Sequence, residues 1–371
     1  MGSEMLLYGY GAVCLSMLVF NIVYNIVMKG SSRRLERRSG RLAERIEGQL
    51  FRISRGGSVE EKHIVWLQRK LSHISSLIAF DRVMEEWMTR DGQAEIDEYR
   101  RQLQPVILHL AMIYRKRDNM QAAYFAYFLS RHKLHRHMSV DTVQRILVGY
   151  MEKDSLYCRI NALQALYQFG TAENIAEALI ILDRSGGFFH EKILTDGLLS
   201  FTGDHEQLMG LLWERFEQFS DRMRLAVLNY IRFKSGDYCE RMLAIMTDET
   251  ADKELRLSAI RYFGRYEYQP ALKPLLDFAR DKDPVNWEYE AISLTSLASY
   301  SGEEVIRVLM DAMHSSNWYV RRNAAVSLES HDLDYTDLIE IVSGRDRYAR
   351  EMMMYHLDAR RIKAEGKEAR T

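Results

Sequence analysis

Three short stretches share one frame and decide the fold: Arg159-Ile-Asn-Ala-Leu163, Arg224-Leu-Ala-Val-Leu228 and Arg256-Leu-Ser-Ala-Ile260. The gap between the first two arginines is about twice the gap between the second and the third, so the first gap holds two units. Glu290-Ala-Ile-Ser-Leu294 and Asn323-Ala-Ala-Val-Ser-Leu328 continue the series as Ala-apolar-Ser-Leu. A frame that returns at this spacing is typical of helical-repeat proteins.

Glycines mark a turn inside each unit. Gly170, Gly203 and Gly236 follow one another at equal steps, each precedes a Thr or Asp, and Gly302 takes the same role later. We expect each glycine to end a first helix in a left-handed conformation and the next residue to cap a second helix. The predicted second helices are Thr171–Leu182, Asp204–Phe219, Asp237–Met246, Pro270–Arg280 and Glu303–His314. One helix pair cannot bury its apolar face alone, so the pairs are predicted to stack into an all-α solenoid over residues 151–360.

The repeats resemble the HEAT-repeat family, in the form seen in bacterial PBS-lyase HEAT-like repeats. The resemblance covers about residues 152–360. It rests on three sets of an acidic or capping residue, an arginine and an apolar residue: Asp221, Arg224, Leu228; Asp252, Arg256, Ile260; Trp318, Arg321, Leu328. The unit around His190–Phe201 lacks the arginine, which leaves the register there open. Tetratricopeptide repeats have a similar length, but their Trp, Gly, Tyr, Ala, Phe and Pro series is not traceable in this chain.

The resemblance implies two different functions. HEAT-like solenoids serve as scaffolds that bind proteins, and similar bacterial chains with one membrane span accompany membrane glycosyltransferases or other envelope machinery. The PBS-lyase relationship also permits a bilin-lyase-like enzyme that would hold a chromophore on the concave face of the repeats.

Composition excludes several classes of protein. Of 371 residues, 47% are apolar and 28% are charged, which is ordinary for a globular chain and excludes wholesale disorder. The three cysteines include no CxxC pair, so they form no disulfide framework. The four prolines favour helices over strand-and-turn architectures.

An uncharged stretch runs from Met5 to Met28. As a helix it would extend about 36 Å, enough to cross a hydrocarbon layer of about 30 Å. It follows Glu4 and ends in basic residues, which favours an uncleaved anchor over a cleaved signal peptide. We therefore predict a transmembrane helix over residues 5–28.

The positive charge next to this stretch predicts its orientation. The flank after the span contains Lys29, Arg33, Arg34, Arg37, Arg38, Arg41 and Arg45. Because Lys and Arg stay on the cytoplasmic side, we expect a single-pass cell-membrane protein with its N-terminus outside and residues 29–371 in the cytoplasm. Free cysteines fit that reducing compartment.

The same flank, residues 29–57, is predicted to be a basic amphipathic linker helix. Its apolar residues recur at helical spacing: Leu35, Leu42, Ile46, Leu50 and Ile53. Residues 29–55 carry a net charge of +6, which leaves −7 for the rest of the chain and argues against nucleic-acid binding by the repeat body. The charge either only fixes the topology or also binds anionic lipid through residues 5–55.

Two amides interrupt the apolar stretch. Asn21 and Asn25 lie four residues apart, on one helical face. They either bond to another span inside the membrane or are hydrated near its cytoplasmic boundary.

Residues 58–150 are predicted to form an irregular helical block. Ser58 and Glu61 have capping-box spacing before a helix Val59–Ala79, and Pro105 interrupts or opens the next one. Further helices are predicted over Asn119–His132 and Asp141–Met151. At the other end, residues 361–371 are predicted to be a flexible tail.

A search for chemistry finds little. No phosphate-binding loop, nucleophile elbow, HExxH or EF-hand loop occurs, and no cofactor is expected. His132, His135 and His137 could ligate a metal, but Arg131, Lys133 and Arg136 surround them with positive charge. We favour a solvated basic turn over a metal site there.

Aromatic residues give the candidate contacts for a protein partner, which is itself expected to be membrane-embedded. They are Tyr262, Tyr266, Tyr268, Trp287, Tyr289 and Trp318. Tyr and Trp are frequent binding anchors, although packing between repeats would explain the same residues. The sequence thus predicts a non-catalytic, membrane-anchored scaffold, with the bilin-lyase-like enzyme as the alternative.

Overall fold

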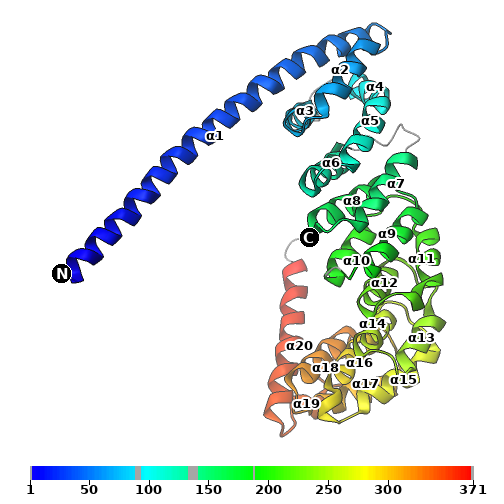
Figure 1. Ribbon diagram of the computed structural model, residues 1–371. Helices are drawn as coiled ribbons and strands as arrows, with labels where there is room; N and C mark the ends of the chain where they lie inside the picture. The colour runs from blue at the N-terminus through cyan, green and yellow to red at the C-terminus, as the bar shows by residue number, and fades with distance from the viewer. Residues whose placement is uncertain (1, 88–92, 133–140, 187–188, 369–371) are drawn as a thin grey trace. The chain divides into compact units, whose positions relative to one another are not determined.

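The computed structural model describes residues 2–87, 93–132, 141–186 and 189–368 (Figure 1). Within these ranges the chain forms helices and no strand, which confirms the all-α prediction. The helices group into two compact units, one comprising the chain up to residue 187 with 201–204 and the other comprising 188–200 with the chain from 205 onward.

Unit 1 contains the long N-terminal helix, the irregular block and one repeat pair. Its helices are α1 (Gly2–Ser54), α2 (Glu61–Leu71), α3 (Ile74–Trp87), α4 (Gln93–Gln102), α5 (Gln104–Arg115), α6 (Asn119–His132), α7 (Asp141–Gly149), η2 (Tyr150–Glu152), α8 (Leu156–Phe169) and α9 (Ala172–Arg184). Pro105 opens α5, as expected for a residue that has no N–H to leave unbonded. Thr171 caps α9 in a capping box with Asn174, which confirms that turn.

The long N-terminal helix corrects the expected division at residue 29. α1 runs through the apolar stretch and the basic segment without a break, so the latter is not a separate linker. Ser39, Leu42 and Ile46 of α1 are buried, and the helix packs against α3 and α4. The part of α1 from Ser39 onward is therefore the first helix of the folded body.

Two smaller predictions about unit 1 are wrong. The helix expected over Val59–Ala79 is divided at Ser72 into α2 and α3. α2 begins at Glu61 with Glu60 at its N-cap position and no side-chain cap, so Ser58 and Glu61 form no capping box. Instead, Glu60 forms an ion pair with Arg52 of α1 at 2.7 Å, which holds the start of α2 against the end of α1.

Unit 2 is a stack of helix pairs. Its helices are α10 (Glu191–Leu199), α11 (His205–Glu214), η3 (Phe216–Gln218), α12 (Asp221–Lys234), α13 (Cys239–Thr247), α14 (Lys253–Phe263), α15 (Gln269–Arg280), η4 (Pro284–Asn286), α16 (Trp287–Leu297), α17 (Glu303–Ala312), α18 (Trp318–Ser330), α19 (Ile339–Val342) and α20 (Arg347–Glu368). The first helices α10, α12, α14, α16, α18 and α20 pack side by side in chain order (Figure 1). This order is the one the repeat frame predicts for the solenoid.

The recurring arginine of the frame is a clamp on the turn that precedes its helix. Its guanidinium donates to backbone carbonyls there: Arg224 to Phe216 at 3.1 Å, Arg256 to Met246 at 3.2 Å and Arg321 to Ser315 at 2.6 Å. Arg256 also lies 4.9 Å from the ring centre of Tyr289 in the next unit. Each clamp gives a loop carbonyl a charged donor, which is stronger than a neutral one.

One of the two units that lack this arginine, the unit of α16, reverses the polarity of the clamp. Glu290 of α16 occupies the corresponding position and is 4% exposed. Lys282, in the preceding turn, donates to Glu290 at 2.6 Å. The turn is thus held to the helix by an ion pair instead of by an arginine–carbonyl bond.

The turn glycines are required for a different reason from the one predicted. Of Gly170, Gly203, Gly236 and Gly302, only Gly302 has a positive φ, of 134°. A Cβ on Gly170 would lie 2.7 Å from the carbonyl oxygen of Leu166, and one on Gly236 would lie 2.8 Å from the ring of Tyr266. Glycine is required at these two turns because neighbouring atoms leave no room for a Cβ, and not because the backbone is left-handed there. The cap predicted at Asp237 is also wrong, because α13 begins later, with Tyr238 at its N-cap position.

The expected flexible tail is helical as far as the structure describes it. α20 extends to Glu368, so it does not end near residue 360. Arg360 donates to the carbonyl of Leu333 at 2.5 Å, and Arg361 lies 3.7 Å from the Asp358 carboxylate.

Replacing Arg256 by Ala should lower the stability of unit 2. The variant loses a charged hydrogen bond and leaves the Met246 carbonyl without its donor, at a cost of about 1.5–3 kcal/mol. Urea unfolding of the detergent-solubilised chain measures the change. Arg307→Ala, at an exposed position on α17, is the matched control and should stay within about 0.5 kcal/mol of the parent. Equal stability of the two variants would contradict the clamp.

Candidate partner-binding surface

Three of the six aromatic residues predicted to bind a partner pack between repeats. Tyr262 is 0% exposed, and its hydroxyl accepts from the Tyr238 N–H at 3.1 Å. Tyr266 packs on Tyr262 with ring centres 4.8 Å apart. Tyr289 is 8% exposed and stacks on Phe278 at 5.4 Å. These three side chains therefore match the alternative interpretation, in which the aromatic residues pack between repeats instead of binding a partner.

The remaining aromatics lie closer to the surface. Tyr268 is half-buried, and its N–H donates to the hydroxyl of Tyr300 at 3.1 Å. Trp287 is also half-buried and stacks on Tyr319 at 5.4 Å. Trp318 is 51% exposed and meets the same Tyr319 edge-on at 5.1 Å. Trp318 is thus the predicted residue that is most available to a partner.

Trp318 lines an open groove between α18 and α20, with a volume of about 670 Å³. We call it the α18–α20 groove, and its lining residues are Trp318, Arg321, Arg322, Glu329, Tyr348, Glu351, Met352, Tyr355, His356 and Ala359. Tyr348 and Tyr355 are 68% and 70% exposed. Three large aromatic side chains therefore surround one groove while remaining accessible.

The charged side chains of the groove are held by the protein itself. Arg321, clamped to its turn, lies 5.3 Å from the ring centre of Tyr348. Arg322 lies 5.9 Å from the ring centre of Trp318. Nδ1 of His356 is 2.9 Å from a carboxylate oxygen of Glu329. Side chains fixed in this way lose little conformational freedom when a partner binds.

The aromatic residues of α20 were missed by the sequence reading, although a signal exists. Tyr348, Met352, Tyr355 and Ala359 recur at steps of four, three and four residues, which marks one face of a helix. The repeat frame drew attention to first helices that carry its Arg-small-apolar series, and α20 lacks it. A search for periodicity alone would have found this face.

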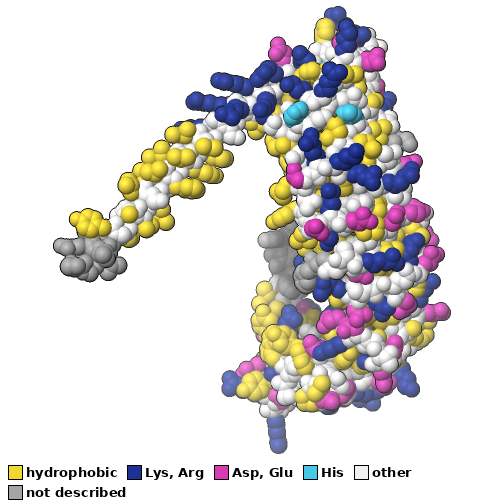
Figure 2. All heavy atoms as spheres, in the orientation of Figure 1, with side chains coloured by type: hydrophobic (Ala, Val, Ile, Leu, Met, Phe, Trp, Pro, Cys, Tyr) yellow, Lys and Arg dark blue, Asp and Glu magenta, His cyan; other side chains and the backbone are white. Residues whose placement is uncertain are grey.

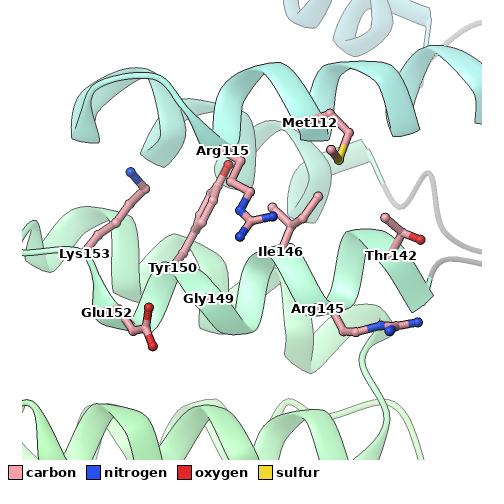
Figure 3. Close-up of a pocket in the computed structure, with 9 residues that line it drawn as sticks. All are labelled: Met112, Arg115, Thr142, Arg145, Ile146, Gly149, Tyr150, Glu152 and Lys153. Atoms are coloured by element: carbon pink, nitrogen blue, oxygen red, sulfur yellow. The ribbon is translucent and has the colours of Figure 1, made fainter.

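A second open cavity, of about 600 Å³, lies in unit 1 between α5 and α7 (Figure 3). Arg115, Arg145 and Lys153 line it together with Glu152, so its charge is mixed. The aromatic side chain in the lining, Tyr150, is 1% exposed and offers no accessible anchor. We assign no function to this cavity.

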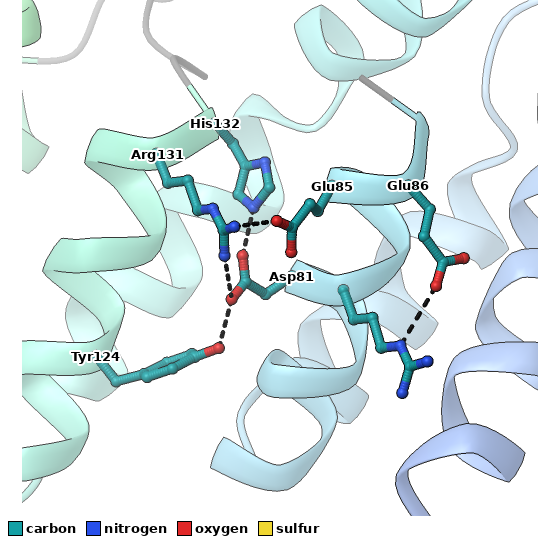
Figure 4. Close-up of polar contacts among 7 residues, drawn as sticks. Asp81, Glu85, Glu86, Tyr124, Arg131 and His132 are labelled. Carbon is teal, nitrogen blue, oxygen red and sulfur yellow. Dashed lines mark hydrogen bonds and ion pairs between the residues drawn. The ribbon is translucent and has the colours of Figure 1, made fainter. Parts of the chain in front are cut away.

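The histidine cluster predicted as a solvated turn begins with a buried side chain. His132 is 1% exposed, and its Nε2 is 2.5 Å from Asp81 of α3 (Figure 4). Tyr124 donates to the other oxygen of Asp81, and Arg131 forms ion pairs with Asp81 and Glu85. Burial tends to raise the pKa of Asp81, but the hydrogen bonds from His132 and Tyr124 lower it overall. His132 is therefore a structural tie between α3 and α6.

The rest of that cluster cannot be placed, since His135 and His137 lie outside the described residues. Among the residues that are described, no group of three or more His, Cys, Asp or Glu side chains could hold a metal ion. Asp81 and His132 form an acid–base pair, but both side chains are buried, which closes the pair to a substrate.

The basic residues of the membrane flank are accessible. Lys29, Arg33, Arg34, Arg37, Arg38, Arg41 and Arg45 are all exposed along α1. Figure 2 shows hydrophobic side chains along the first part of this helix and Lys and Arg side chains along the part that follows. Within the apolar part, the Asn25 amide donates to the Asn21 carbonyl at 2.8 Å, so one of its donors is satisfied inside the helix.

His63 makes the stability of unit 1 depend on pH. Its Nε2 lies 2.9 Å from the Tyr99 hydroxyl, and the side chain is buried between α2 and α4. Burial, assisted by the positive charge of Arg45, lowers the pKa of His63 from 6.5 to about 4. In the unfolded chain His63 becomes protonated near pH 6.5, whereas in the folded chain it does so only near pH 4. Lowering the pH from about 6.5 to about 4 therefore stabilises the unfolded state relative to the folded state, and the protein loses stability across this range.

We therefore expect the parent to lose up to about 3 kcal/mol of stability across that window, and His63→Gln to lose less. Chemical denaturation at a series of pH values measures the difference. His109→Gln replaces an exposed histidine of the same unit and should keep the acid dependence of the parent. A His63→Gln chain as acid-sensitive as the parent would contradict this account.

One comparison with known proteins agrees with the repeat architecture. Residues 239–329, which run from α13 into α18, match a family model described as HEAT repeats. None of the curated proteins matches this sequence. A designed armadillo repeat protein, YIII(Dq)4CqI, is similar at 16% sequence identity over 67% of this chain and 98% of its own, with a TM-score of 0.19 that is too low to support an argument. The stacked helix pairs and the match over residues 239–329 make this chain a helical-repeat protein.

Proposed function

We propose that this protein is a non-catalytic scaffold, anchored in the cell membrane by α1, that docks a protein partner in the α18–α20 groove. The family resemblance extends this proposal to a membrane-bound envelope or glycosyltransferase complex as the partner. Residues 29–371 would then lie in the cytoplasm, and the partner would be embedded in or attached to the same membrane.

The exposure of the apolar part of α1 supports the anchor. This helix carries an 18-residue window with a mean hydropathy of 1.9, and none of the window is buried in the folded body. Leu15 and Phe20 are 64% and 68% exposed. A buried helix of a soluble core would not leave such side chains uncovered, whereas a bilayer stabilises them. The basic residues that follow favour the cytoplasmic orientation.

The single observation that supports docking most directly is the accessible aromatic set in the α18–α20 groove. Trp318, Tyr348 and Tyr355 each leave at least half of the side chain exposed around one concavity. Isolated exposed aromatics are common, but a converging set next to fixed charges is typical of binding hot spots. A membrane anchor would raise the local concentration of a membrane-bound partner at this groove.

Two observations favour a scaffold over the bilin-lyase-like alternative. The carboxylate–imidazole pair Asp81–His132 is closed to ligands, so it cannot act on a substrate. The repeated polar contacts of unit 2, by contrast, hold its turns in place, and its α18–α20 groove presents accessible aromatic side chains.

A photo-crosslinking residue placed at Tyr355 tests the proposal in native membranes. We expect a discrete crosslinked protein that survives an alkaline wash with the membranes. The double variant Trp318→Ala and Tyr348→Ala should reduce its yield at least tenfold, because truncating a hot-spot aromatic costs about 2 kcal/mol or more.

The matched control carries the crosslinker at Tyr157, which is 69% exposed on α8 in unit 1. The same product from both positions, or none from Tyr355, would contradict docking in the groove. Release of the chain by the alkaline wash would contradict the anchor separately.

A further inference from the structure

A second cavity, next to the basic part of α1, has a different chemistry from the α18–α20 groove. It has a volume of about 640 Å³, is open to solvent and is lined by residues of α1, α2 and α3 of unit 1. Its lining residues are Arg38, Arg41, Leu42, Glu44, Arg45, Trp66, Lys70 and Ser76. We call it the basic cavity.

The cations of the basic cavity lack partners of opposite charge. Arg38, Arg41 and Arg45 recur at steps of three and four residues on one face of α1, and Lys70 faces them from α2. None of the four forms an ion pair with a carboxylate in the described part of the chain, and Glu44 is the one acid in the lining. Like charges at this helical spacing are mutually destabilising. Such a cluster is stabilised when an anion occupies the space between its members.

One of these cations is held in place before any ligand arrives. The guanidinium of Arg45 lies 4.3 Å from the ring centre of Trp66 on α2. Trp66 is half-buried and packs against His63 at 5.7 Å. Leu42, 5% exposed, contributes an apolar part of the wall. A stacked arginine beside an apolar wall is a pre-organised donor for a planar or tetrahedral anion.

We propose that the basic cavity binds a phosphate-bearing ligand. Arginine favours phosphate because its donors form a fixed fork that bonds two oxygens at once. Arg38, Arg41 and Lys70 supply further donors, and the hydroxyl of Ser76 lies in the same lining. This site is distinct from the proposed partner groove, and it does not depend on the scaffold function.

The distance from the apolar stretch limits the source of the phosphate. Arg38 is ten residues beyond Met28, about 15 Å along a straight helix. The polar layer of one leaflet is only about 5–7 Å thick. With the proposed anchor placing Met28 at the hydrocarbon boundary, the phosphate of an ordinary phospholipid would not reach the basic cavity, whereas a soluble phosphate compound would, as would a headgroup whose own phosphates project from the bilayer.

Isothermal titration calorimetry on the full chain in nanodiscs tests this proposal, with pyrophosphate as the probe. The parent in phosphatidylcholine should bind pyrophosphate. The double variant Arg38→Gln and Arg41→Gln should bind it at least about tenfold more weakly, since it removes two phosphate contacts. Arg33→Gln and Arg34→Gln together remove the same charge from the same helix outside the cavity, and that control should bind within about twofold of the parent.

A second set of nanodiscs contains phosphatidylinositol bisphosphate and identifies the source. If pyrophosphate binds the parent more weakly there, and the difference is absent in the Arg38→Gln/Arg41→Gln chain, a projecting lipid headgroup occupies the cavity. If pyrophosphate binds equally in both kinds of nanodisc, the ligand is soluble. Absence of pyrophosphate binding to the parent in phosphatidylcholine, or equal loss in the two double variants, would overturn the proposal.

Discussion

The packing of α1 against α3 and α4 connects the proposed membrane anchor to the folded body of unit 1. Leu42 and Ile46 are 5% and 0% exposed, and each is worth about 1.5–3 kcal/mol when it is removed from water. Ser39 adds a hydrogen bond to the carbonyl of Ala79 at 3.4 Å. Because the same helix continues into the apolar stretch, the proposed anchor is rigidly attached to unit 1. The basic cavity exists only because this packing brings α1 beside α2.

Within unit 2, each repeat depends on contacts made with its neighbours. Hydroxyls of the first helices donate to carbonyls of the preceding first helix, as Ser296 does to Ile260 at 2.9 Å and Ser327 to Leu294 at 2.8 Å. These bonds require small side chains at the interface, which explains the Ala and Ser of the frame. α20 packs on α18, and Tyr348 and Tyr355 stay accessible in the groove between these two helices.

The sequence predicted the features that repeat and missed those that occur once. The frame at Arg224 and Arg256 predicted the class of fold and the order of the helices, because each unit packs against its neighbours through the same types of residue. The frame did not predict that Glu290, at the position of the arginine, forms an ion pair with Lys282, because that contact is visible only in the structure. The continuity of α1 was also missed, because Gly40 and Gly48 weaken a helix by propensity alone. Of the candidate site, Trp318 was predicted and the aromatic face of α20 was not, because the groove depends on two helices meeting.

The most direct test of the account is the distance between spin labels on α1. Labels at Asn25→Cys and Gly48→Cys, in a chain whose three native cysteines are replaced, lie on either side of residue 29, where the predicted division falls. Double electron–electron resonance in nanodiscs should give one narrow distribution, consistent with a backbone separation of about 35 Å along a continuous helix. A broad distribution, or one centred at a clearly shorter distance, would contradict the claim that α1 is a single rod from the apolar stretch into the folded body.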